Sequence, residues 1–445
     1  MSINSKHPET QVLHAGYRAD PATGSVAAPI YQTATTAVAV PMYQTSSYQF
    51  QNTEQAANLF SLKELGNIYT RIMNPTCDVL EQRITALEGG AAALTVSSGQ
   101  AASALAIQNL AKAGDNIVSS TDLYGGTWNL FNNTLRDQGI EVRFVDPSDP
   151  QQFLNATDER TRAYYAETLP NPKLHVFPIA EVASIGKDLG IPLIIDNTAA
   201  PILCRPFDHG AAIIVYSTTK YIGGHGTSIG GLIVDSGSFP WDQYPDRQPA
   251  LNKPDPSYHG AVWVDAVKTI GPVAYIIKAR TTLLRDLGAA FSPFNAFQII
   301  QGLETLPLRM REHSRNASAV AGFLSQHASV SNVIHPSLQN GEVLKRAEKY
   351  LHGGYGGLVG FELKGGRNSG EKFINSLKLF YHVANIGDTR SLAIHPASTT
   401  HSQLSPEDQK STGVSQSYIR LSIGIEHIDD IIEDLEQALS ASNLI

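Results

Sequence analysis

Short apolar runs alternate with amphipathic stretches from Asn74 to about residue 215, and this alternation limits the possible folds more than any other feature of the chain. The apolar runs predict strands at 91–96, 116–119, 142–145, 163–166, 192–195 and 211–215. The stretches between them predict helices after the Asn74 turn and at 100–111, 127–138 and 179–189. Such alternation is typical of an α/β fold in which helices cover both faces of a mostly parallel sheet. Ligands in that architecture bind beyond the carboxyl ends of the strands, so the residues that follow each strand are the candidates for a site.

One lysine follows the last of these strands. The run at 211–215 leads into Ser217, Thr219 and Lys220, and then into a glycine-rich loop. A lysine partly withdrawn from water loses some of its preference for the charged form, which suits it to attack a carbonyl and hold it as a Schiff base. The two hydroxyls are donors of the kind that bind a phosphate. If this short motif stood alone, the alternative would be more common: an ordinary surface lysine before a flexible loop.

Two further strand ends carry groups that suit a planar, phosphorylated ligand. Ser98, Gly99 and Gln100 stand where the strand at 91–96 passes into a helix, so free backbone N–H groups there can hold a phosphate. Tyr124 follows the strand at 116–119, and its ring can lie against a planar cofactor. A structural turn and a packing tyrosine are the alternatives for these two motifs when each stands alone.

The next two strands end in an amide and a carboxylate. Asn171 lies between two prolines after the strand at 163–166, which leaves it little conformational freedom. Asp196 ends the buried strand at 192–195 and needs a partner, because a buried lone carboxylate costs several kcal/mol. A protonated pyridine nitrogen is such a partner, and the carboxylate in turn keeps the ring an electron sink. A helix cap is the alternative for Asp196.

Composition narrows the class of protein. The 445 residues carry a formal net charge of −8 without a long basic block, which argues against nucleic-acid binding. No apolar run reaches membrane-spanning length, and the N-terminal residues match neither a signal nor a transit peptide. Two cysteines, Cys77 and Cys204, are too few for a disulfide scaffold or a zinc site. We therefore expect a soluble cytoplasmic protein without a metal site.

Three parts of the chain differ in pattern. Residues 1–73 are poor in periodicity and are expected to form an arm, in which Pro29 to Thr33 recurs nearly unchanged as Pro41 to Thr45. Residues 74–272 hold the alternating pattern. Residues 273–445 are expected to form a smaller α+β domain, closed by a helix with one apolar stripe of Ile428, Ile431, Ile432, Leu435 and Leu439.

Taken together, the motifs resemble those of the pyridoxal-phosphate-dependent enzymes of cysteine and methionine metabolism, the trans-sulfuration enzymes. The motifs that match in order and spacing are Tyr69-Thr-Arg71, Asn74-Pro-Thr76, Ser98-Gly-Gln100, Leu123-Tyr-Gly-Gly-Thr127, Asp196-Asn-Thr198 and Ser217-Thr-Thr-Lys220. Within that family the chain is most similar to the O-acetylhomoserine sulfhydrylase branch. The features that point there are Leu13-His-Ala-Gly16, a long loop after Asp235 that ends at Gly260, Asn385-Ile-Gly-Asp388 and Tyr418-Ile-Arg-Leu-Ser422.

The resemblance implies aminotransferase fold type I, pyridoxal 5'-phosphate as cofactor and a role for each matched residue. Lys220 would carry the cofactor and move protons. Tyr124 would stack on the pyridine ring, and Asp196 would pair with the nitrogen of that ring. The implied phosphate ligands are Ser98, Gly99, Gln100, Ser217 and Thr219. Arg420 would hold the substrate carboxylate, with Asn171 and Asn385 beside it. Tyr69 and Arg71 would reach the phosphate of a neighbouring subunit, which implies a dimer, doubled to a homotetramer.

The implied reaction is γ-replacement on O-acetyl-L-homoserine with sulfide or methanethiol, giving L-homocysteine or L-methionine plus acetate. Cystathionine γ-synthase or a cystathionine or methionine lyase is the alternative within the family, and a catalytically inactive scaffold is the alternative from another class. Gly126 stands where methionine γ-lyases of the family carry a cysteine, which disfavours that lyase activity. The sequence leaves open the preferred thiol, acetyl against succinyl donors, a biosynthetic or salvage role, and which copy of the arm repeat lies near the site.

Overall fold

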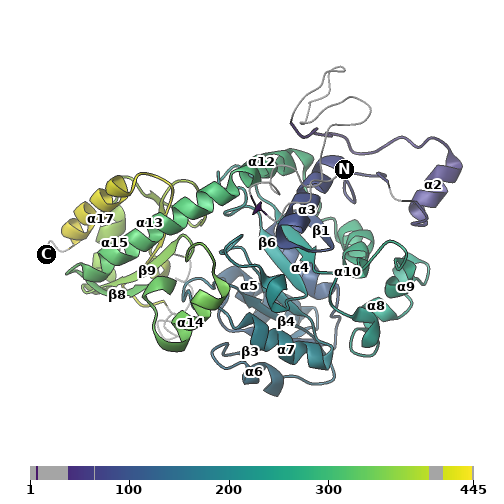
Figure 1. Ribbon diagram of the computed structural model, residues 1–445, viewed down its shortest axis with the longest axis horizontal. Helices are drawn as coiled ribbons and strands as arrows, with labels where there is room; N and C mark the ends of the chain where they lie inside the picture. Colours follow the sequence, from purple (N-terminus) through teal and green to yellow (C-terminus); the bar gives the residue numbers. More distant parts are fainter. Residues whose placement is uncertain (1–6, 9–38, 65, 400–413, 443–445) are drawn as a thin grey trace.

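A computed structural model describes residues 7–8, 39–64, 66–399 and 414–442 of the chain. Two sheets, each covered by helices, make up most of it (Figure 1). The larger sheet is built from residues 92–235, and the smaller one from residues 330–422. No helix among the described residues is both long and apolar enough to cross a membrane.

The larger sheet has seven strands in the order β1-β7-β6-β5-β4-β2-β3. Their bounds are β1 (Ala92–Val96), β2 (Asn116–Ser120), β3 (Glu141–Val145), β4 (Thr161–Glu167), β5 (Leu193–Asp196), β6 (Ile213–Ser217) and β7 (Gly231–Asp235). β7 is antiparallel to both of its neighbours, and the pairs from β6 to β3 are parallel. The predicted mostly parallel sheet is therefore confirmed.

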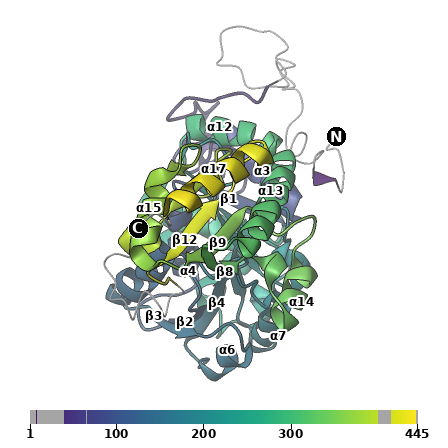
Figure 2. The ribbon, with the colours of Figure 1, turned by 90° about the vertical axis from the view of Figure 1, so that its left-hand side faces the viewer.

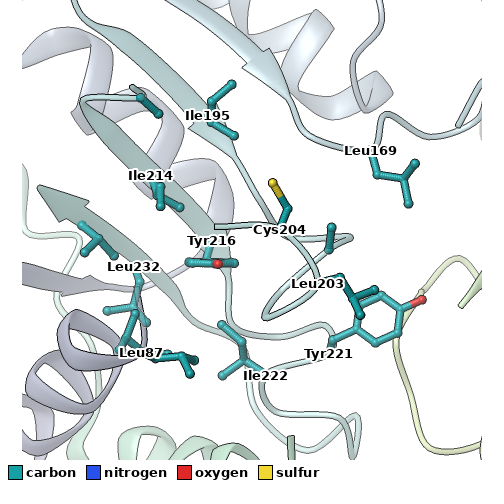
Figure 3. Packing of buried hydrophobic residues seen from close by; sticks show 14 of the residues in the cluster. Leu87, Leu169, Ile195, Leu203, Cys204, Ile214, Tyr216, Tyr221, Ile222 and Leu232 are labelled. Carbon is teal, nitrogen blue, oxygen red and sulfur yellow. The ribbon is translucent and has the colours of Figure 1, made fainter. Parts of the chain in front are cut away.

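Helices pack on both faces of this sheet. Those that contact its strands most are α3 (Pro75–Glu88), α4 (Gly99–Gln108), α7 (Ile179–Leu189) and α10 (Ala274–Lys278). The other helices of this part of the chain are α5 (Gly125–Asn129), α6 (Gln151–Asn155), α8 (Pro249–Asn252), α9 (Trp263–Ala266), α11 (Arg285–Leu287) and α12 (Pro293–Glu304). Strand β6 shows why both faces are buried, because its side chains alternate between two cores. Ile214 and Tyr216 lie in one core with residues of α3 and α7, and Figure 3 shows them near Leu87 of α3. Ile213 and Val215 lie in the other core with residues of α4.

The predicted elements exist, and their ends differ where hydrogen bonding sets them. The last parallel strand covers Ile213–Ser217 rather than 211–215, because pairing with β5 and β7 rather than apolarity decides where it ends. The helix expected at 127–138 begins at Gly125 and passes into a π-helical turn over Leu130–Leu135. Strand β7 was not predicted, because its five residues directly follow a glycine-rich segment.

The smaller sheet has five strands in the order β10-β11-β12-β9-β8. Their bounds are β8 (Val330–Ile334), β9 (Leu358–Leu363), β10 (Tyr381–His382), β11 (Leu392–Ile394) and β12 (Tyr418–Ser422). The helices around it are α13 (Leu306–Gln326), α14 (Gly341–Tyr350), α15 (Gly366–Ser376) and α17 (Ile428–Ser442), seen from the side in Figure 2. The predicted stripe on α17 is confirmed, since Ile431, Leu435 and Leu439 are fully buried and Ile428 and Ile432 pack beside them. The predicted domain boundaries at 73 and 272 stay predictions.

Apart from residues 7–8, the described part of the arm covers residues 39–64 and 66–74, up to α3. Helix α2 (Thr53–Phe60) lies to one side of the molecule (Figure 1). The second copy of the repeat lies against the start of α3, where the Thr76 hydroxyl donates a hydrogen bond to the Pro41 carbonyl (2.7 Å). The first copy, at Pro29, and the Leu13 motif lie outside the described residues.

Candidate active site

The carboxyl ends of the parallel strands meet at one cavity of about 260 Å³. Every residue predicted for the cofactor or substrate lines it except the two on the arm: the lining includes Ser98, Gly99, Gln100, Tyr124, Asn171, Asp196, Ser217, Thr219, Lys220, Asn385 and Arg420. Nine of these come from the ends of β1, β2, β4, β5 and β6, as the strand-end argument predicts. Arg420 comes from β12 of the smaller sheet and Asn385 from the segment between β10 and β11, so the second part of the chain completes the cavity.

Lys220 lies between the two sheets. Its Nζ donates a hydrogen bond to the side-chain oxygen of Asn385 (2.6 Å). Burial, and to a smaller extent the positive charge of Arg420, lowers the pKa of Lys220 to about 8. A primary amine that loses its proton near neutral pH is fitted to act as a nucleophile or as a base.

Arg420 brings a buried positive charge to the cavity from β12. Its side chain is 8% exposed, and Nη2 donates a hydrogen bond to the Asn385 carbonyl (3.0 Å). No carboxylate among the described residues forms an ion pair with it, and its Nε has no hydrogen-bond partner there. A buried guanidinium without an anion can accept a ligand carboxylate through two parallel hydrogen bonds.

The N-terminus of α4 points its backbone at the cavity. Ser98 caps this helix by accepting a hydrogen bond from the Ala101 N–H (3.1 Å), which leaves the Gly99 and Gln100 N–H groups free of that cap. A Cβ at position 99 would lie 2.6 Å from the Ser217 Cβ, so only glycine lets the helix approach β6 this closely. The backbone groups and the Ser217 hydroxyl together suit a phosphate.

Tyr124 and Asp196 both line the cavity, and they differ in how far they are withdrawn from water. Tyr124 is 52% exposed, although a tyrosine ring is normally packed. Asp196 is enclosed at the end of β5, where burial raises the pKa of its carboxyl while the Thr198 N–H (2.9 Å) stabilises the charged form. An exposed ring and a half-buried carboxyl in one cavity suit a flat, cationic heterocycle.

Tyr69 and Arg71 do not line this cavity. Arg71 donates a hydrogen bond to the Arg285 carbonyl, and its guanidinium lies 5.3 Å from the centroid of the Tyr69 ring. Within their own chain these two residues are thus separated from Lys220. Their predicted role in a neighbouring subunit stays a prediction.

Several residues of the cavity were not predicted. They are Thr127, Glu167, Leu169, Thr198, Ala199, Ile229, Ala384 and Ile386. Glu167 carried the same signal as Asp196, a carboxylate at the end of a buried strand, and that signal alone was enough to find it. Thr198 lies inside a motif already singled out, whereas Ile229 and Ala384 carry no signal that distinguishes them from core residues.

Comparison with known proteins places the chain in a family. The model of the family described as Cys/Met metabolism PLP-dependent enzyme matches residues 32–440. The chain belongs to this family. O-acetyl-L-homoserine sulfhydrylase of Leptospira meyeri is 52% identical over 439 residues, which cover 97% of this chain and 96% of the relative. Homocysteine synthase of Schizosaccharomyces pombe is 48% identical over 444 residues, or 99% and 100% of the two chains.

A solved structure agrees with the family assignment. A Campylobacter jejuni crystal structure that contains N'-pyridoxyl-lysine-5'-monophosphate superposes with a TM-score of 0.90 at 41% identity. The match covers 98% of this chain and 100% of the other. The cofactor of this Cys/Met metabolism enzyme is therefore pyridoxal 5'-phosphate.

The cavity fits that cofactor on structural grounds. The α4 N-terminus offers a phosphate site, the half-exposed Tyr124 ring offers a flat apolar surface, and the half-buried Asp196 offers a counter-charge for the pyridine nitrogen. Lys220 supplies an amine of lowered pKa among them. The donor set thus matches each part of the group: phosphate, ring, nitrogen and aldehyde.

Proposed function

We propose that this chain catalyses γ-replacement on O-acetyl-L-homoserine, in which sulfide or methanethiol displaces acetate and gives L-homocysteine or L-methionine. The observation that carries the proposal is the match, over nearly the whole chain, to relatives named O-acetyl-L-homoserine sulfhydrylase and homocysteine synthase. The lysine, carboxylate and arginine that such chemistry requires line one cavity in this chain. An inactive scaffold of the same fold would have no reason to keep all three.

Arg420 and Lys220 divide the work on the substrate. Arg420 binds the α-carboxylate, because its buried guanidinium has no anion of its own. Lys220 takes the proton from the α carbon, and its lowered pKa keeps part of the amine neutral at physiological pH. When bound, pyridoxal phosphate withdraws electrons from that carbon. After a further proton leaves the β carbon, the γ C–O bond breaks and acetate departs with the bonding electrons. The thiol sulfur then bonds to the γ carbon and gives up its proton, and protons return to the β and α carbons.

Five groups keep the cofactor in place in this proposal. Asp196 pairs with the pyridine nitrogen, and Tyr124 lies on the ring. Ser217 and the N-terminus of α4 bind the phosphate together with Thr219. The Gln100 side chain already donates to the Gly126 carbonyl (2.9 Å), so Gln100 serves the phosphate through its backbone N–H.

The assembly and the cell compartment extend the proposal. Tyr69 and Arg71 complete the phosphate site of a neighbouring subunit, and Asn171 and Asn385 contact the cofactor or the substrate carboxylate. The enzyme then works as a homotetramer, a dimer of dimers, in the cytoplasm. The separation of the two arm residues from the cavity of their own chain supports this arrangement.

Product analysis tests the proposed reaction. The cofactor-loaded protein is incubated with O-acetylhomoserine, O-succinylhomoserine or cystathionine, each with and without sulfide, and the products are identified by mass spectrometry. We expect homocysteine and acetate from O-acetylhomoserine only when sulfide is present, and no product from the Lys220→Ala variant. Cleavage of cystathionine, or a preference for the succinyl donor, would assign the chain to another activity of the family.

A further inference from the structure

Glu167 lines the cavity but has no part in the reaction as derived above. It is the last residue of β4, it is 7% exposed, and no basic side chain among the described residues forms an ion pair with it. A buried carboxyl beside a cofactor site needs a physical reason, because burial without one destabilises the fold.

The contact that Glu167 makes is with the backbone of Tyr124. The Tyr124 N–H donates a hydrogen bond to Glu167 Oε1 (2.6 Å), across 43 positions of sequence. Tyr124 stands directly before α5, and no side chain caps that helix. The loop that carries the tyrosine ring is thus fixed to the end of β4 through this carboxyl.

The position of the Tyr124 ring depends on this backbone. The ring is half exposed, so little side-chain packing holds it. It lies over Gly126 so closely that a Cβ there would be 2.5 Å from the Tyr124 Cε1 atom. A shift of the backbone at residue 124 would therefore move the whole ring relative to the other residues that line the cavity.

A second carboxyl lies beside Glu167. On the neighbouring parallel strand, Asp196 is its register partner, so both side chains point to the same face of the sheet. Burial and the negative charge of Asp196 raise the pKa of Glu167 well above its ordinary value, with a smaller contribution from Asp122. Backbone N–H groups of Tyr124 and Asn171 oppose this effect but do not outweigh it.

The contacts of Asp196 and Glu167 indicate which of the two carboxyls is charged and which is protonated. Asp196 receives the Thr198 N–H and faces the cofactor nitrogen in the proposed function, so it carries the negative charge. Glu167 takes the proton, because two adjacent buried carboxylates would repel each other. A protonated carboxyl still has a carbonyl oxygen that accepts a hydrogen bond.

We propose that Glu167 is a positioning residue that works as a neutral carboxylic acid. Its carbonyl oxygen holds the Tyr124 backbone, and with it the ring that lies on the cofactor, without placing a second negative charge beside Asp196. The inference rests on the proposed function only for the cofactor site, and the identity of the amino-acid substrate does not enter it.

Two substitutions of matched size separate the acceptor from the charge. Glu167→Gln keeps a neutral carbonyl oxygen at the same place, whereas Glu167→Met fills the volume without an oxygen. Cofactor affinity is measured by titrating the apo-protein with pyridoxal phosphate, and the asymmetry of the bound cofactor by its circular dichroism in the visible range. Neither readout requires turnover. Asp196→Asn, which removes the proposed charge, serves as the comparison.

We expect Glu167→Gln to bind the cofactor within about twofold of wild type and to keep its dichroic band. Glu167→Met should bind about tenfold more weakly, the effect of losing one buried hydrogen bond, and its band should be reduced. A Gln variant that loses affinity as Asp196→Asn does would show that the carboxylate charge is needed, and would overturn the inference. So would a Met variant with wild-type affinity and dichroism.

Two further outcomes remain decisive. If the Met variant does not fold, as judged by far-ultraviolet circular dichroism, the Gln variant still decides between the neutral acceptor and the charged carboxylate. A wild-type protein that binds the cofactor but makes no homocysteine would refute the proposed function and leave the inference on Glu167 standing.

Discussion

At Lys220, burial and a neighbouring positive charge both lower the pKa of the side-chain amine. Burial lowers the pKa of Lys220 most, and the Arg420 guanidinium adds to it, to a value of about 8. The Asn385 amide oxygen accepts the Nζ hydrogen bond and so orients the amine. The charged form of the lysine prevails below this pH and the neutral, reactive form above it.

The pH dependence of cofactor uptake tests this balance at Lys220. The apo-protein should take up pyridoxal phosphate faster as pH rises, with a midpoint near 8. In Arg420→Gln the midpoint should move upward, because the nearby positive charge no longer disfavours the ammonium form. Arg315→Gln, a change of the same kind at an exposed position, should leave the midpoint unchanged. A wild-type midpoint near 10.5, the ordinary pKa of lysine, would contradict the account.

At the scale of elements, helix α13 holds the segment that follows Lys220. Arg309 on this helix is 4% exposed and donates to the carbonyls of Tyr221 (2.7 Å), Ile222 (3.1 Å) and Gly302 (2.7 Å). The guanidinium thus connects α12, α13 and the turn after β6. Tyr221 and Ile222 also belong to the core beneath β6 and β7 (Figure 3).

Replacing the Arg309 guanidinium by a lysine amine should remove some of these hydrogen bonds and lower the stability of the protein. The Gly302 carbonyl also accepts from Thr305, but a lysine has no fork to reach the Tyr221 and Ile222 carbonyls together. Arg309→Lys therefore leaves at least one buried carbonyl without a partner, which should lower the free energy of unfolding by about 2 kcal/mol. Urea denaturation at saturating cofactor measures the change. Arg315→Lys lies on the same helix but is 68% exposed, and we expect an effect below about 0.5 kcal/mol. Equal effects of the two substitutions would show that Arg309 does not hold the turn.

The same helix shows where sequence reasoning ends. The strands and helices from α3 to β6, apart from the short helix α6, were predictable because their apolar residues follow periods of two and 3.6. Helix α13 was not resolved from its surroundings, since Arg309, His313 and Asn316 are buried and interrupt its apolar pattern. Their hydrogen bonds go to backbone groups far along the chain, and no local signal reveals such partners.

For the site, the strand-end rule located one side and only the family resemblance located the other. Lys220 and Asp196 follow predicted strands, so their approach to each other was predictable from topology. Arg420, in β12, and Asn385, in the segment between β10 and β11, lie 165 positions or more from Lys220 along the chain. Nothing in composition or periodicity specifies where the smaller sheet lies relative to the larger one, so this half of the cavity required the structure.

For the whole molecule, the arm has the least support from its own chain. Helix α2 lies to one side of the body, and Tyr258 donates one hydrogen bond from its hydroxyl to the Phe60 carbonyl there (2.7 Å). Phe60 and Tyr69 expose much of their rings. A segment with exposed aromatic rings and few contacts is expected to pack on another copy of the chain.

Mixed dimers test whether the arm serves a neighbouring subunit. Arg71→Ala and Lys220→Ala chains, each nearly inactive alone, are combined under conditions that exchange subunits. If the arm crosses over, each mixed dimer has one site with both defects and one site with none, so activity should return. Lys220→Ala combined with Asp196→Ala is the matched control and should stay inactive, because both residues line the cavity of one chain. No recovery in the first mixture, with exchange verified by mass spectrometry, would keep the arm on its own subunit.

The most direct test is to identify the lysine that carries the cofactor. Among the described residues a second lysine, Lys278, is also buried with its pKa lowered to about 8, but it donates to Asn109 (3.1 Å) away from the cavity. Borohydride reduction of the loaded protein fixes the pyridoxyl group, and peptide mass spectrometry locates it. We predict the label on Lys220 alone. A label on Lys278 or on any other lysine would contradict the assignment of this cavity as the active site.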